Sequence, residues 1–68
     1  MKKSIDFYPS TEADIVGLNE DGTVLCDLYG EVNGESYVSR GVSFPADSPV
    51  LALTPDEIDQ IRAEFGQN

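Results

Sequence analysis

The segment of residues 23–44, TVLCDLYGEVNGESYVSRGVSF, decides the fold of this chain. Residues 23–32 and 35–44 are rich in Val, Tyr, Phe and Ser, and their apolar residues show the period-two character of β-strands. Between them stands Asn33-Gly34, the dipeptide that most strongly signals a short hairpin turn. The segment therefore predicts an antiparallel hairpin, and residues 13–18 predict a third, shorter strand before it.

Two pairing registers compete for this hairpin, because a slip of one residue moves every side chain to the other face. A two-residue type I′ turn at Asn33-Gly34 places the apolar residues of the first strand opposite Ser and Gly. A three-residue loop of residues 32–34, with its glycine in the left-handed conformation of a G1 bulge, places Glu31 opposite Glu35. We predict three-residue loops here and at residues 20–22, because they put the apolar residues of all three strands on one face.

This register sorts the strand residues into a buried and an exposed face. The predicted core residues are Val16, Leu18, Val24, Cys26, Leu28, Val38, Val42 and Phe44. The predicted opposite face consists of Ile15, Leu25, Asp27, Tyr29, Glu31, Glu35, Tyr37 and Ser39. On this second face Tyr29 is expected directly opposite Tyr37, with no element left to cover the pair.

The C-terminal segment carries the strongest helix signal. Thr54-Pro55-Asp56-Glu57 combines a capping box with proline at the first helical position and acidic residues at the positive end of the helix dipole. Ile58, Ile61 and Phe65 follow at spacings of three and four and form one apolar stripe, and Gly66 is placed to end the helix. The stripe is expected to cover the sheet, with Phe7 filling one open side.

The predicted fold class is therefore α+β: an antiparallel three-stranded meander with one C-terminal helix packed on one face. Residues 2–9 add a fourth strand in the alternative version of this fold, and the structure of residues 1–10 is left open. At 68 residues the chain forms a single small domain, residues 1–68, with a thin core.

Composition and charge narrow the function classes. The chain has 13 Asp and Glu against 4 Lys and Arg, a formal net charge of -9, which disfavours direct binding to nucleic acid and favours a basic partner. It contains no His, the commonest general base and metal ligand. Cys26 lies in the middle of a predicted strand, on the core side, and reads as a buried structural thiol. The sequence predicts no enzyme, no cofactor and no metal site.

Location follows from what the sequence lacks. There is no apolar run long enough to span a bilayer, and Met1-Lys2-Lys3 is followed by Asp6 and Pro9 rather than by the apolar stretch of a signal peptide. A single cysteine fits a reducing compartment. We expect a cytoplasmic protein that does not contact membranes.

Two binding functions fit these expectations. The first is an inhibitor or decoy that mimics nucleic acid and occupies the groove of a basic nucleic-acid-binding protein. In size and charge alone this is similar to the small acidic anti-restriction and anti-CRISPR proteins of phages. The second is an adaptor or homodimerising module that uses the exposed tyrosine face, with the acidity serving solubility. The predicted partner-binding residues are Asp27, Tyr29, Glu31, Glu35 and Tyr37.

Overall fold

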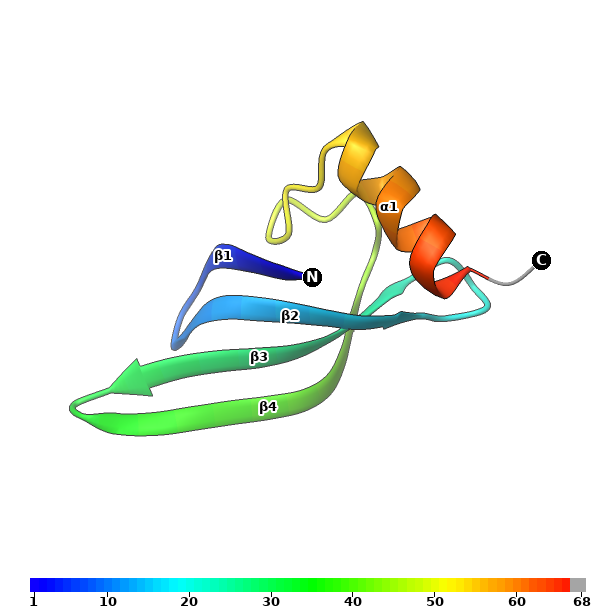
Figure 1. Cartoon of the computed structure of the whole chain (residues 1–68). Helices are drawn as coiled ribbons and strands as arrows, with labels where there is room; N and C mark the ends of the chain where they lie inside the picture. The colour runs from blue at the N-terminus through cyan, green and yellow to red at the C-terminus, as the bar shows by residue number, and fades with distance from the viewer. Residues whose placement is uncertain (67–68) are drawn as a thin grey trace.

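The computed structural model describes residues 1–66, which form a four-stranded antiparallel sheet and one helix (Figure 1). The elements are β1 (Lys2–Phe7), β2 (Ser10–Leu18), β3 (Val24–Val32), β4 (Glu35–Phe44) and α1 (Pro55–Phe65). The strands are ordered β1-β2-β3-β4, so each pairs with its neighbour in sequence. The α+β meander is confirmed in its four-stranded version. The molecule measures 43 × 19 × 16 Å, because the β3–β4 hairpin extends well beyond the helix.

The β3–β4 hairpin turns through two residues, not three. Asn33 and Gly34 both have positive φ, 54° and 83°, and Val32 pairs with Glu35. This is the geometry of a type I′ turn, for which Asn-Gly is the favoured dipeptide. The predicted three-residue loop with Glu31 opposite Glu35 is therefore wrong.

A bulge in β4 restores the apolar pairing near the core. Arg40 and Gly41 together lie opposite the single residue Asp27, so the register shifts by one and Cys26 pairs with Val42. Gly41 has a φ of 70°, a left-handed conformation that glycine adopts without steric cost. Its amide N–H donates to Asp27 Oδ1 at 3.2 Å. In a continuous register, a two-residue turn at Asn33-Gly34 would pair the apolar residues of β3 with Ser and Gly. The bulge allows this turn and also pairs Cys26 with Val42.

The β2–β3 turn has the predicted construction, and a bulge in β2 lies shortly before it. Gly22 has a φ of 90°, and Leu18 pairs with Val24 as expected. The ladder then shifts at Val16, so that Ile15 takes the inward position opposite β3. The prediction that Val16 is buried and Ile15 exposed is wrong: Ile15 is 1% exposed and Val16 40%.

The core lies between the inner face of the sheet, α1 and the loop that joins them. Its buried apolar residues are Ala13, Ile15, Val24, Cys26, Leu28, Phe44, Leu51 and Ile61. The predictions for Val24, Cys26, Leu28 and Phe44 are confirmed, and Leu18 and Val42 are half-buried against this cluster. Val38 is not in the core, because the two-residue turn places it on the opposite face, where it pairs with Tyr29. Phe7 packs edge-to-face on Phe44, with ring centroids 5.7 Å apart.

Helix α1 begins and ends as predicted. Thr54 Oγ1 accepts from the Glu57 N–H at 3.1 Å, and Glu57 Oε1 accepts from the Thr54 N–H at 2.9 Å, which completes the capping box. Gly66 ends the helix in an extended conformation, and its N–H donates to the Arg62 carbonyl at 2.8 Å. Lys3 Nζ lies 2.6 Å from Glu57 Oε1, so the first turn of α1 is tied to β1.

This tie makes stability depend on pH. The hydrogen bonds from the Lys3 ammonium and from the Thr54 backbone N–H hold the pKa of Glu57 below its ordinary value. A carboxylate with a lowered folded-state pKa stabilises the fold above its unfolded pKa, and this stabilisation is lost as pH falls through the folded value. We expect wild type to melt higher than Glu57→Gln near neutral pH, and the gap to narrow below about pH 4.3. Thermal unfolding followed by circular dichroism measures the gap. A gap that stays constant with pH would contradict the assignment.

Candidate functional site

The end of the sheet that α1 does not cover is formed by two neighbouring turns. The β1–β2 turn contains Tyr8 and Pro9, joined by a cis peptide bond, and the β3–β4 turn contains Asn33-Gly34. Both turns lie at the left of Figure 1, with the helix at the other side. Ser10 pairs with Gly30, and Gly30 pairs with Tyr37, so the two segments are adjacent across the sheet. We call residues 6–11 and 29–38 together the distal end.

The distal end holds all three tyrosines of the chain. Tyr8 is 83% exposed and Tyr37 44%, whereas Tyr29 is half-buried. The Tyr37 hydroxyl donates to Glu35 Oε1 at 3.1 Å. These rings stay accessible because α1 packs mainly against β2 and does not extend over the far end of the β3–β4 hairpin. A tyrosine ring offers a large apolar surface and a polar tip, so three of them at one end form a surface suited to protein contact.

The five predicted partner-binding residues all lie on the β3–β4 hairpin, but they do not share one face. Tyr29 pairs with Val38, and Tyr37 pairs with Gly30, so the two tyrosines point to opposite faces of the sheet. The prediction that Tyr29 lies directly opposite Tyr37 is wrong, because it assumed the three-residue loop. Strand alternation places the five residues in two groups: Asp27, Tyr29 and Glu31 on the outer face, and Glu35 and Tyr37 on the face that carries α1.

Asp27 differs from the other four because its carboxylate is engaged within the chain. It accepts from the Gly41 N–H at 3.2 Å and lies 3.3 Å from Arg40 Nη1, and its side chain is 16% exposed. Its evident contribution is to hold the β4 bulge. Two exposed residues of the distal end were missed from the sequence: Tyr8, because residues 1–10 were left unplaced, and Val38, because the register placed it in the core.

Carboxylates occur on every element of the chain, and on the outer face of the sheet Asp14 of β2 is paired with Asp27 of β3. Several are neutralised locally: the Met1 amino group lies 3.6 Å from Asp14, Lys3 pairs with Glu57, and Arg40 with Asp27. The distal end is different. Its two segments contain the acidic residues Asp6, Glu31 and Glu35 and no Lys or Arg. The exposed tyrosines therefore stand in a locally negative surface.

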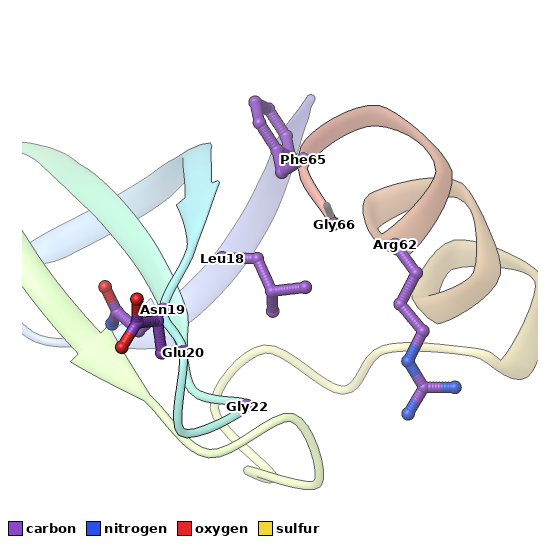
Figure 2. Close-up of a pocket in the computed structure, with 7 residues that line it drawn as sticks. All are labelled: Leu18, Asn19, Glu20, Gly22, Arg62, Phe65 and Gly66. Carbon is purple, nitrogen blue, oxygen red and sulfur yellow. The ribbon is translucent and has the colours of Figure 1, made fainter. Parts of the chain in front are cut away.

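A hollow of about 670 Å³ lies at the opposite end of the molecule, between the end of α1 and the β2–β3 turn. Its lining residues are Leu18, Asn19, Glu20, Gly22, Arg62, Phe65 and Gly66. Figure 2 shows Leu18 pointing toward the helix, whereas the charged ends of Glu20 and Arg62 lie on opposite sides of the hollow. Asn19, one of the polar lining residues, is engaged within the chain, because its Nδ2 donates to Thr23 Oγ1 at 2.9 Å and to Ser43 Oγ at 3.0 Å.

Cys26 is buried as predicted. Burial, and then the negative charges of Asp27 and Asp14, raise the pKa of its thiol to about 11, so the reactive thiolate is scarce at neutral pH. Within residues 1–66 no group of three His, Cys, Asp or Glu side chains is placed to hold a metal ion. In the same range, no helix has the length and apolar character needed to cross a membrane.

Comparison of the chain with protein-family models, with curated proteins and with solved structures finds no match. The choice of a candidate site therefore rests on the geometry of this chain. The distal end is where exposed aromatic side chains coincide with carboxylates and where the two segments supply no cation.

Proposed function

We propose that this protein is a non-enzymatic binding module that recognises a partner protein with a basic surface through its distal end. The observation that carries the proposal is the coincidence of Tyr8, Tyr29 and Tyr37 with Glu31 and Glu35 in segments free of Lys and Arg. Tyrosine is enriched among the residues that dominate protein interfaces, and its ring also attracts the cationic side chains of a partner. The carboxylates steer such a partner and set its orientation.

The charge distribution supports an extended mimic of nucleic acid less well than it supports a local contact at the distal end. Such mimicry needs carboxylates in regular, closely spaced rows, because duplex DNA carries one charge per ~1.7 Å of its axis. Here the neighbouring carboxylates Asp14 and Asp27 are each paired with a cation, the Met1 amino group and Arg40. We therefore propose a local acidic contact. An inhibitor that blocks the nucleic-acid site of a basic protein is one form that this contact can take.

Two charge-matched double variants test the proposal. Glu31→Gln with Glu35→Gln removes two charges from the distal end, and Asp59→Asn with Glu64→Gln removes two from exposed positions of α1. Tagged wild type and both variants are used to capture proteins from lysate at low and at high salt, followed by mass spectrometry. The Kd of the retained protein is then measured with each purified variant and with Tyr37→Ala.

We expect the distal double variant and Tyr37→Ala each to raise Kd by at least about tenfold, because removal of an interface hot spot has effects of this size or larger. The α1 double variant should change Kd by less than about threefold, and added salt should weaken binding, since exposed charge pairs are screened. Equal losses from both double variants would show that overall charge, not the distal end, drives binding. Binding that ignores salt would contradict a basic partner.

A further inference from the structure

The two edges of the sheet are protected to different degrees. In the described part of the chain β1 and β4 each pair on one side, and an unpaired edge invites another strand unless charges, bulges or covering elements prevent it. On β1, Lys2 and Lys3 supply charge, and the ladder is irregular between Ser4 and Phe7. Lys3 also donates to the Ala52 carbonyl at 3.1 Å, which ties this edge to the loop before α1. The β1 edge is therefore guarded.

The β4 edge is guarded at one end only. Arg40 and the bulge at Gly41 interrupt it, but residues 35–39, ESYVS, contain no Lys, no Pro and no bulge, and all five are exposed. At ~3.4 Å per residue this regular stretch is about 17 Å long, the length of an ordinary strand. It is the open edge of the sheet, and it lies within the distal end except for its last residue.

The exposed apolar side chains of this stretch point to both faces of the sheet. Tyr37 is 44% exposed and Val38 47%, and successive strand residues project to opposite sides. A partner that packs on one face can cover one of the two. A strand added alongside β4 has side chains on both faces and can contact both.

The chemistry of the added strand follows from the same alternation. Glu35 and Tyr37 lie on one face, and the Tyr37 hydroxyl bonds to the Glu35 carboxylate, so this face suits Arg or Lys side chains. Val38, on the other face, suits apolar side chains. We infer that the partner binds by strand addition: an extended segment of alternating basic and apolar residues pairs with residues 35–39 of β4. The inference rests on the proposed function and specifies the element of the partner that makes the contact.

A second copy of this chain fits the edge less well. Each copy has a formal net charge of -9, so two copies repel each other as they approach. This repulsion opposes association most strongly at low salt. A basic segment meets attraction at the same place.

Synthetic peptides test the inference. The probe is a capped peptide of about eight residues in which Arg and Val alternate, a typical strand length. One control carries N-methyl groups on alternate backbone nitrogens, which removes hydrogen-bond donors but keeps the charge. Two such peptides are tested, one methylated at the odd-numbered residues and one at the even-numbered residues. The other control replaces Arg with Glu. Binding is followed by the backbone amide shifts of residues 35–39 compared with those of β1.

Two matched protein variants locate the site. Val38→Lys places a positive charge on the open edge, and Val16→Lys places the same charge at a similarly exposed valine on β2. We expect the parent peptide to change the backbone amide shifts of residues 35–39. One of the two N-methylated peptides, and the Val38→Lys variant, should each raise Kd by at least about tenfold. Val16→Lys should change Kd by less than about threefold. The acidic peptide should not bind.

Each remaining outcome overturns the inference in an identifiable way. Undiminished binding of both N-methylated peptides would show that backbone pairing is not used, while the basic contact of the proposed function stands. If the peptide does not bind to the folded protein, the partner does not use a segment of alternating basic and apolar residues. The result of the lysate capture, which tests the proposed function, would still hold. Shifts of residues 35–39 that grow with protein concentration, together with a dimer in sedimentation, would identify a second copy as the occupant.

Discussion

Replacement of Gly30 by alanine is expected to destabilise the protein by at least ~3 kcal/mol, the upper range for overpacking a well-packed site. An added Cβ would lie 2.0 Å from the Pro9 carbonyl oxygen and 2.8 Å from Ser10 Cα. Both are backbone atoms, so relief requires that the β1–β2 turn move away from β3. A chain of this size is expected to have a free energy of unfolding of about 3–10 kcal/mol. The loss is therefore at least about a third of the total free energy of unfolding. Urea denaturation followed by circular dichroism measures it.

Gly17→Ala is the matched control for this prediction. Gly17 also lies in the sheet, but its added Cβ would meet the Leu25 side chain at 3.5 Å, an ordinary van der Waals distance. We expect a change within about 1 kcal/mol, the scale of the Gly-to-Ala difference in backbone entropy. A similar small change at Gly30 would show that the β1–β2 turn does not lie against β3 as described.

Leu51→Ala is expected to cost ~2–5 kcal/mol, the range for large-to-small changes in a core. Leu51 stands in the loop between β4 and α1, yet its side chain is completely buried in the cluster that joins sheet and helix. Truncation leaves a cavity, because this small core has few side chains that could move into the space. The same denaturation experiment gives the loss in free energy.

Val16→Ala is the comparison that tests the corrected core. Sequence periodicity places Val16 in the core, whereas in the structure it is the bulged, 40% exposed residue of β2. We expect a change of less than ~0.5 kcal/mol, as for ordinary surface substitutions. A loss at Val16 larger than that at Leu51 would contradict the β2 register and restore the sequence-based one.

Local signals along the chain were sufficient wherever a few adjacent residues control the outcome. The capping box at Thr54 and Glu57 and the apolar stripe predict α1 within its observed bounds, because caps and periodicity are properties of neighbouring residues. Gly22 likewise predicts the β2–β3 turn, since few other residues tolerate positive φ. The α+β class follows from these elements and their order.

The candidate site was predicted in part. The sequence predicts that Tyr29 and Tyr37 are uncovered members of one hairpin, and that carboxylates accompany them. Their distribution over two faces depends on the two-residue turn, which Asn33-Gly34 itself indicates. The prediction failed there because it required one register along the whole hairpin. It did not allow a change of register farther along β4.

The amino-acid sequence by itself determined the helix, three of the four strands, the apolar character of most of the core and the excess of negative charge. The tertiary structure decided which side of the sheet residues such as Ile15, Val16 and Val38 face. A bulge at Val16 or Gly41 shifts every later pairing by one residue, and its position depends on how two strands fit each other and the core. Tertiary packing also decided that Leu51 is buried and that residues 35–39 of β4 remain an open edge, because both depend on where α1 and its loop come to rest.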